Sequence, residues 1–166
     1  MTTDQSAASL FAAALRLART NPNGFLTTHD GRRPRTRLVE HVAVDDDGTV
    51  WIGTSPRSRK AADVAAHPEV TYAVEDRAAQ AYVVLQGEAV LEDGLPLRLA
   101  HWKDDFEAFF PGGPEGDDYV LLRLRPHRVE LMDFTRRIHP APFGLVPAVV
   151  ERDGAGWRAV PAERRP

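Results

Sequence analysis

Turn-forming residues divide much of this chain into short strand-forming runs, and this alternation is the feature that most restricts its fold. Asp30-Gly31 separates residues 25–28 from residues 36–44, and the Asp-Asp-Asp-Gly sequence at 45–48 leads directly into residues 49–53. Asp-Gly pairs favour tight hairpin turns between antiparallel strands. The first third of the chain is therefore predicted to contain three successive antiparallel strands.

The same alternation continues along the rest of the chain. Residues 70–74 and 81–91 are rich in β-branched and aromatic residues and are predicted to form central strands. Pro126 separates residues 119–125 from residues 128–134, which predicts two further strands, and residues 153–156 favour a hairpin turn in the tail. Apolar residues at helical spacing predict helices over residues 6–20, 61–66 and 96–109.

These elements together predict a mainly β fold. Six or more antiparallel strands with short turns indicate a closed or nearly closed β-barrel with peripheral helices. A doubly wound sheet is not expected, because hairpins dominate and no Gly-rich strand-to-helix turn is present. The length of 166 residues suits a single domain, residues 1–166.

Composition restricts the chemistry that the chain can perform. There is no cysteine, which excludes disulfides, thiolate nucleophiles and cysteine-ligated metal centres. Any redox chemistry must therefore come from a bound cofactor. No segment has the apolar length of a membrane span, and residues 1–10 lack the basic and apolar pattern of a secretion signal, so a cytoplasmic protein is expected.

Charge is unevenly distributed along the chain. The formal net charge of −3 argues against a nucleic-acid-binding surface. Basic residues are concentrated in one third of the chain, at Arg32, Arg33, Arg35, Arg37, Arg57, Arg59 and Lys60. Acidic residues are concentrated in another part, at Asp104, Asp105, Glu107, Glu115, Asp117 and Asp118. We expect the basic third to contain a binding site.

Residues 54–60, Thr-Ser-Pro-Arg-Ser-Arg-Lys, have the composition of an anion-binding segment. They lie between a predicted strand and a predicted helix, where Ser58 is expected to be the N-cap. Helix N-termini carry partial positive charge and free N–H groups, which favour anions. Arg35 and Arg37 share one face of the preceding strand region, because strand side chains alternate. The sequence therefore predicts a phosphate site here.

With strand, anion segment and helix in this order, the chain resembles the FMN-binding split-barrel superfamily, which includes pyridoxamine 5′-phosphate oxidase and the related general stress proteins. Residues 35–41 are similar to the family's first flavin-phosphate strand, and residues 54–60 to its Thr-x-x-x-Ser-Arg-Lys segment. Later matches are Gly87, Trp102, Phe110-Pro111, Asp117-Asp118 and residues 121–133. The resemblance covers about residues 10–134, leaves 135–166 as a C-terminal tail, and implies a six- to seven-stranded split barrel.

The resemblance also implies the cofactor and the assembly. Family members bind FMN at the interface of a homodimer, each site using both chains. The residues implied in cofactor binding are Arg35, Arg37, Thr54, Ser55, Ser58, Arg59, Lys60 and Tyr82. The arginines and Lys60 would hold the phosphate, Thr54 and Ser55 would donate hydrogen bonds, and Tyr82 would pack against the flavin ring edge. The alignment with the family fits two registers that differ by two residues, so either Arg35 or Arg37 faces the phosphate.

Three positions bear on the substrate. Glu40 stands where the oxidase has a lysine for the substrate phosphate, and a carboxylate there would repel a phosphorylated vitamer. Arg137-Ile138-His139 resembles the oxidase's Arg-Leu-His substrate motif, but Pro140-Ala141-Pro142 replaces the residues that follow it. A true pyridoxamine phosphate oxidase is therefore not expected.

Two classes of function fit these residues. The first is an FMN-dependent oxidoreductase acting on an unknown small substrate, for which no catalytic residue is assigned. The alternative is a non-catalytic stress protein that binds flavin, deazaflavin F420 or haem. The six histidines show no metal-ligand spacing, so no metal site is expected, and a nucleic-acid module using the arginine cluster is disfavoured because exposed aromatics are not interleaved with it.

Overall fold

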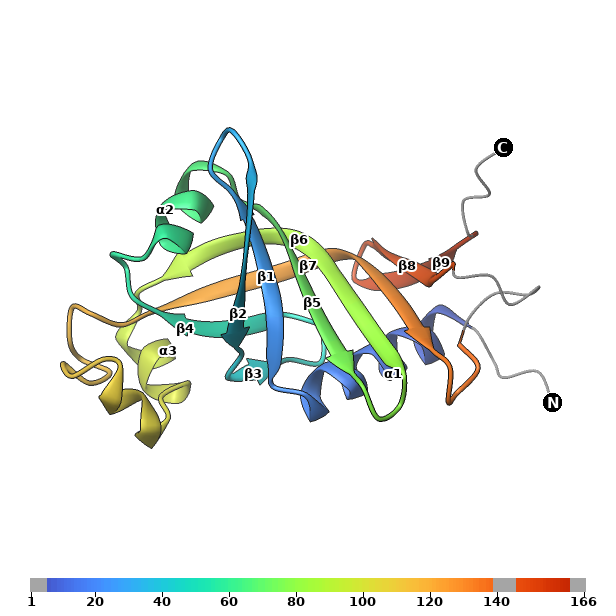
Figure 1. Cartoon of the computed structure of the whole chain (residues 1–166), viewed down its shortest axis with the longest axis horizontal. Coiled ribbons are helices and arrows are strands. Elements are labelled where there is room, and N and C mark those ends of the chain that lie inside the picture. Colours follow the sequence, from blue (N-terminus) through green and yellow to red (C-terminus); the bar gives the residue numbers. More distant parts are fainter. Residues whose placement is uncertain (1–5, 139–145, 162–166) are drawn as a thin grey trace.

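One antiparallel sheet dominates the structure (Figure 1), which is a computed structural model describing residues 6–138 and 146–161. The main strand order is β2-β1-β5-β6-β7-β4-β3, and β8 and β9 extend the sheet from β7. The bounds are β1 Asn23–His29, β2 Pro34–Glu40, β3 Ala43–Val44, β4 Val50–Thr54, β5 Glu69–Asp76, β6 Ala81–Glu92, β7 Val120–Asp133, β8 Ala148–Asp153 and β9 Gly156–Val160. The mainly antiparallel β fold is confirmed, but the described sheet is not closed, since β2 and β3 end its path.

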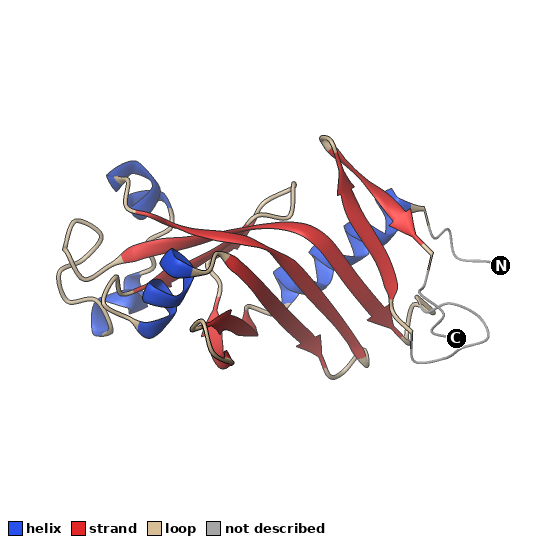
Figure 2. Cartoon of the chain, turned by 90° about the horizontal axis from the view of Figure 1, so that it is seen from above, coloured by secondary structure: helices blue, strands red, loops and turns tan. Residues whose placement is uncertain are grey.

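Four helical segments accompany the sheet in the described residues. They are α1 Ala7–Thr20, α2 Arg59–Ala66, α3 Leu95–Ala100 and the 3₁₀ helix η1 Asp104–Ala108. Helix α1 lies along the sheet at the end that carries β8 and β9, whereas α2 and α3 lie at the opposite end (Figures 1 and 2). The β1–β2 hairpin projects beside α2 (Figure 1).

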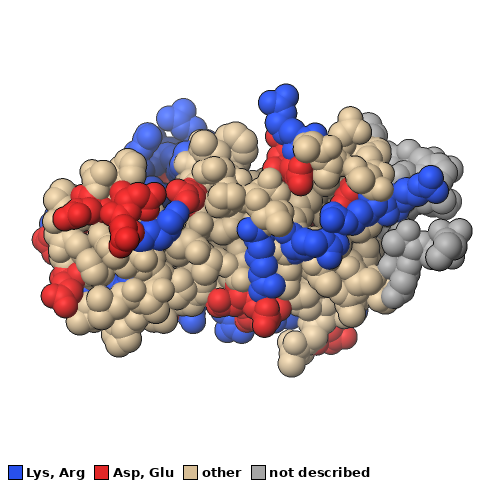
Figure 3. All heavy atoms as spheres, turned by 90° about the horizontal axis from the view of Figure 1, so that it is seen from below, with Lys and Arg blue, Asp and Glu red and all other residues tan. Residues whose placement is uncertain are grey.

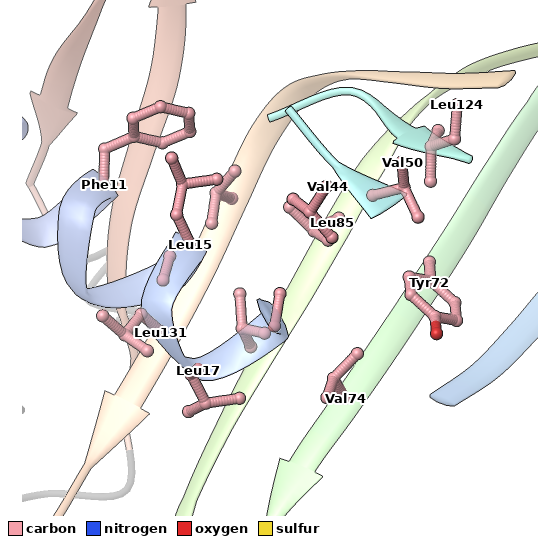
Figure 4. Close-up of a cluster of buried hydrophobic side chains, with 14 of the residues drawn as sticks. Phe11, Leu15, Leu17, Val44, Val50, Tyr72, Val74, Leu85, Leu124 and Leu131 are labelled. Carbon is pink, nitrogen blue, oxygen red and sulfur yellow. The ribbon is translucent and has the colours of Figure 1, made fainter. Parts of the chain in front are cut away.

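The main core lies between α1 and the concave side of the sheet. Phe11, Leu15 and Leu17 point from α1 toward side chains of β5, β6 and β7 (Figure 4). Ser6 caps this helix by accepting a hydrogen bond from the Ser9 N–H, and the ring of Trp157 on β9 stacks on Phe11 at 4.4 Å. Burying this apolar stripe stabilises the short helix, which propensity alone would leave marginal.

The predicted strand over residues 36–44 is wrong in one respect, because it is divided. β2 ends at Glu40 and a separate short strand, β3, follows. At the break the His41 N–H donates to the Pro22 carbonyl, and the His41 side chain turns inward to hydrogen-bond the Tyr72 hydroxyl at 2.8 Å. The break allows β2 to pair with β1 while β3 pairs with β4.

The predicted division at Pro126 is also wrong, since β7 runs through it as one strand. Its pairing with β6 shifts register between Gln86 and Gly87, so that Gly87 lies opposite Pro126. A Cβ on Gly87 would lie 2.1 Å from the Arg125 carbonyl oxygen. The irregularity accommodates a residue without an N–H, and only glycine permits the close backbone approach.

The helix predicted over residues 96–109 is two segments rather than one. His101 ends α3, and Lys103 has extended backbone before η1 begins. The break brings Trp102 against Phe106 and Tyr119 in a second, smaller hydrophobic cluster. We call residues 95–118 the aromatic lobe.

Acidic and basic side chains lie close together at one end of the molecule, where Arg57 before α2 pairs with Asp117. Acidic side chains gather at the end of the molecule that carries the aromatic lobe (Figure 3). In the described residues, no helix is long and apolar enough to cross a membrane.

Candidate functional site

The predicted anion segment forms a structured connection between β4 and α2. Ser58 is the N-cap, as predicted, and its hydroxyl accepts a hydrogen bond from the Ala61 N–H at 3.2 Å. The same hydroxyl lies 3.2 Å from that of Thr54, which is buried at the end of β4. Helix α2 starts two residues earlier than predicted, so Arg59 and Lys60 occupy its first turn.

Strand β2 brings Arg35 and Arg37 to the same region. Their cross-strand partners on β1 are Thr28 and Leu26, whose side chains are buried. Both guanidiniums reach the carboxylate of Asp63 on α2, Arg35 with an N···O distance of 3.0 Å and Arg37 with one of 3.5 Å. The predicted common face of the two arginines is therefore present, and an internal carboxylate bridges them.

Further contacts fix the two guanidiniums. Arg37 donates to the Thr28 hydroxyl at 2.7 Å and to the Leu26 carbonyl at 3.3 Å. Arg35 also pairs with Asp30 in the β1–β2 turn at 2.7 Å. Burial lowers the pKa of Arg37. The carboxylate of Asp63 raises this pKa and the cation of Arg59 lowers it, and the net result is a lowered pKa.

Lys60 differs from these arginines because its charge is not compensated. Its side chain is half-buried, and among the described residues it has no hydrogen-bond or ion-pair partner. Burial lowers the pKa of Lys60, and the nearby Arg37 lowers it further. Arg59 is exposed and also lacks a described counter-ion. Two cations thus lie at the start of α2 beside the arginine pair, with no negative partner in the part of the chain that the structure describes.

The hairpin next to this cluster is also basic. Asp30, Arg32, Arg33 and Arg35 line an open recess of about 580 Å³ at the tip between β1 and β2. The Asp30 carboxylate accepts hydrogen bonds from the backbone N–H groups of Arg33 and Arg32, which lower its pKa. These bonds fix the turn that places Arg35 beside α2.

Other residues of the anion segment have local partners. The Ser55 hydroxyl accepts a hydrogen bond from the Arg57 N–H at 3.2 Å. Arg57 pairs with Asp117 of the aromatic lobe at 2.7 Å, and both side chains are largely exposed. Contacts of Thr54, Ser55, Ser58 and the two β2 arginines with a cofactor stay predictions.

Tyr82 is not brought together with the arginines in a single chain. It lies on the opposite face of the sheet, where it helps to line a pocket of about 340 Å³. Phe25 and Leu38, which pair across β1 and β2, lie on that face and are 53% and 60% exposed. Within one chain, Tyr82 is therefore separated by the sheet from Lys60 and its neighbours.

Of the three positions predicted to bear on the substrate, the structure describes Glu40 and Arg137, which lie on different elements. Glu40 lies at the end of β2 and accepts a hydrogen bond from Lys103 of the aromatic lobe. Arg137 is exposed in the turn after β7, with a positive φ of 55°. His139 lies outside the described residues.

The sequence interpretation missed Asp63 and Thr28, the residues that hold the arginines. The Thr28 hydroxyl donates to the Asp63 carboxylate at 2.7 Å, and both side chains are buried. A usable signal is the carboxylate of Asp63 next to Val64 on the apolar face of a short helix, since buried carboxylates need a partner.

The sequence profile of a family described as pyridoxamine 5′-phosphate oxidase like matches residues 15–153. The chain belongs to this family. No curated protein matches it in sequence. The family assignment confirms the predicted resemblance, and the match extends into the C-terminal tail as far as the end of β8.

Solved structures similar to this oxidase-like chain share its fold. An FMN-binding protein related to pyridoxamine 5′-phosphate oxidase from Nostoc punctiforme PCC 73102 is 18% identical with a TM-score of 0.72, over 95% of this chain and 96% of its own. General stress protein 26 from Bacillus anthracis str. Sterne is 19% identical with a TM-score of 0.66, over 74% and 93% respectively. PhzG from Burkholderia lata 383, solved with tetrahydrophenazine-1-carboxylic acid, is 18% identical with a TM-score of 0.66, over 95% and 93%. The predicted split-barrel fold is confirmed.

Proposed function

We propose that this member of the oxidase-like family is a flavoprotein that binds FMN. The 5′-phosphate of the FMN is held at the start of α2 in this proposal. Lys60 and Arg59 contact the phosphate in this proposal, and Arg35 and Arg37 provide positive charge behind them. The observation that carries the proposal is Lys60, a half-buried ammonium without a described counter-ion beside another partly buried cation.

A phosphate dianion has the charge that this arrangement lacks. Burying an ammonium costs free energy unless an anion or hydrogen-bond acceptors replace its water, and a second cation nearby adds to that cost. Phosphate oxygens accept charge-assisted hydrogen bonds from both ammonium and guanidinium groups. The N-terminus of α2, capped by Ser58, adds backbone N–H groups and a favourable dipole.

We also propose that the flavin site is completed by a second copy of the chain. Tyr82, Phe25 and Leu38 share a partly apolar face, and Tyr82 is separated from Lys60 by the sheet. A homodimer packed through this face would cover the exposed apolar side chains and allow Tyr82 of one copy to approach the cofactor of the other. Leu38→Asp should therefore convert the dimer to a monomer in light-scattering measurements, and monomeric wild-type protein would contradict the assembly.

The proposed activity is oxidation or reduction of a small organic substrate. Bound FMN would supply the capacity to accept or donate hydride or single electrons. The chain's own contribution is to orient the flavin through its phosphate. Glu40 and Lys103 neutralise each other, so this position offers no free cation for a substrate phosphate. We therefore propose a substrate without a phosphate at that position.

Titration of the purified chain tests the cofactor. FMN, riboflavin, deazaflavin F420 and haem are added separately, and binding is followed by absorbance and by flavin fluorescence. We expect saturable FMN binding that is tighter than riboflavin binding. Arg59→Ala should weaken FMN binding by about threefold to tenfold, the size expected for one exposed charged hydrogen bond.

The control variant is Arg16→Ala, which removes another exposed arginine, from α1, and should leave FMN affinity unchanged. Equal affinities for FMN and riboflavin, or an Arg59→Ala variant with unchanged affinity, would contradict the phosphate site. If F420 or haem bound more tightly than FMN, that molecule would be assigned as the cofactor in place of FMN. Absence of flavin reduction by nicotinamide nucleotides and other electron donors would favour a non-catalytic flavin-binding protein over an oxidoreductase.

A further inference from the structure

Asp63 is the point at which the cationic cluster is held together. It lies in α2, its side chain is only 5% exposed, and it contacts groups from β1 and β2. One carboxylate oxygen accepts from Arg35 at 3.0 Å, and the other accepts from the Thr28 hydroxyl at 2.7 Å and faces Arg37 at 3.5 Å. We propose that Asp63 is a positioning residue for phosphate recognition, which it serves by fixing Arg35 and Arg37; this inference rests on the proposed FMN site.

The charges around Asp63 explain why such a residue is needed. Four cations lie in one region: Arg35, Arg37, Arg59 and Lys60. Burial lowers the pKa values of Arg37 and Lys60, and repulsion from neighbouring cations lowers them further. Asp63 and Asp30 are the carboxylates paired with this cluster among the described residues. They leave two positive charges uncompensated, which matches the charge of a phosphate dianion.

Geometry separates the roles of the two carboxylates. Asp30 contacts Arg35 alone among the four cations and belongs to the hairpin turn. Asp63 contacts both arginines and joins α2, which carries Arg59 and Lys60, to β2. Removing the Asp63 charge would release two guanidiniums and also loosen the helix that presents the other two cations. Removing the Asp30 charge would release one side of Arg35.

The experiment compares FMN with riboflavin, which lacks the phosphate. Dissociation constants for both are measured by fluorescence titration in the wild type, Asp63→Asn and the matched control Asp30→Asn. We expect Asp63→Asn to reduce the preference for FMN over riboflavin by about tenfold while riboflavin affinity changes little. Asp30→Asn, with the same change of charge, should reduce the preference by less than about threefold.

Several results would overturn the proposal. Equal weakening of FMN and riboflavin binding by Asp63→Asn would indicate that Asp63 supports the fold alone. A preference that increases would indicate that Asp63 competes with the phosphate. A wild-type chain with no preference for FMN would overturn the proposed function and this inference with it, whereas a normal wild-type preference retained in Asp63→Asn would overturn the inference alone.

Thr28→Val provides a second test if Asp63→Asn does not fold. It removes the hydroxyl that donates to Asp63 and accepts from Arg37, without changing any charge. We expect this variant to lower the preference for FMN in the same direction by about threefold. An unchanged preference in folded Thr28→Val protein would contradict the role of the network.

Discussion

Lys60 and Lys103 have the same side chain but lie in two regions of the molecule that affect its charged form in opposite ways. Lys60 is half-buried at the start of α2, and burial together with Arg37 lowers its pKa. Lys103 stands between α3 and η1, and its hydrogen bond to Glu40 raises its pKa. The fold provides a counter-charge for Lys103 and leaves Lys60 without a partner among the described residues. This contrast supports the proposal that the α2 region binds an anion.

Local structure explains the difference between the regions. The break between α3 and η1 gives Lys103 an extended backbone, from which its side chain reaches Glu40 and lies 5.5 Å from the centre of the Phe106 ring. Near Lys60 the buried carboxylate is Asp63, but its contacts are with Arg35, Arg37 and Thr28. The Glu40–Lys103 pair is complete within the chain, whereas Arg59 and Lys60 have no carboxylate partner among the described residues.

The largest effect is expected from Lys60→Met, which keeps an unbranched apolar stem but removes the ammonium. FMN affinity should fall by about tenfold to hundredfold, because a charge-assisted hydrogen bond to the phosphate is lost. The free energy of unfolding without ligand should be unchanged or higher, since an unpaired, partly buried cation is removed. Fluorescence titration and urea unfolding measure the two quantities.

Lys103→Met is the matched control for this variant. It removes the same group from the region with an internal partner, so FMN affinity should remain within about threefold of the wild type. If the two variants reduced FMN affinity equally, the distinction between the regions would be lost.

A smaller effect is expected for the ion pair between Lys103 and Glu40. In a double-mutant cycle of Lys103→Met and Glu40→Gln, urea unfolding should give a coupling free energy of about 0.2 to 1 kcal/mol. The value is modest because the side chains are 36% and 38% exposed and water screens their attraction. A coupling indistinguishable from zero would show that Glu40 does not act as the internal counter-charge of Lys103.

The two lysines should also give stability opposite dependences on pH. Because the folded pKa of Lys60 is lowered, the unfolded chain binds more protons between that value and the ordinary 10.5, so stability rises with pH across this window. Because the folded pKa of Lys103 is raised, its stabilisation is complete below 10.5 and is lost as pH rises through the raised value.

Urea unfolding of the wild type and the two methionine variants between about pH 8 and pH 11 measures these slopes. The stability of the wild type relative to Lys60→Met should increase with pH toward 10.5. Relative to Lys103→Met, it should decrease at the alkaline end. Slopes of the same sign for both variants would be inconsistent with the opposite environments described above.

Much of the fold was accessible from the sequence because its signals are local. Alternating strands, Asp-Gly turns and the Ser58 N-cap depend on neighbouring residues, and the structure confirms the hairpins and the cap. The errors occur where distant contacts override local signals. β7 continues through Pro126 because Gly87 on another strand permits it, and the break after His101 allows Lys103 to reach Glu40.

The candidate site shows the same division. The cations were visible in the sequence because Arg35, Arg59 and Lys60 occur in recognisable segments. Their compensation was not visible, because Asp63 meets Arg35 across 28 residues of sequence and Thr28 across 35. Sequence therefore indicated where positive charge gathers, but tertiary structure was needed to distinguish paired cations from unpaired ones.

The smallest effect is expected from Arg57→Ala, which tests whether basic charge in the anion segment is sufficient for phosphate recognition. Arg57 is separated from Lys60 by two residues, but its partner is Asp117, whose side chain is 87% exposed. Exposed ion pairs contribute little to stability, and Arg57 already has a carboxylate partner. FMN affinity should therefore change by less than about twofold and the melting temperature by less than about 2 °C. Isothermal titration and thermal unfolding provide the measurements, with Asp117→Asn as the control that removes the partner instead. A loss of affinity as large as that in Lys60→Met would mean that Arg57 leaves Asp117 to contact the phosphate, and the exposed end of the segment would then belong to the site.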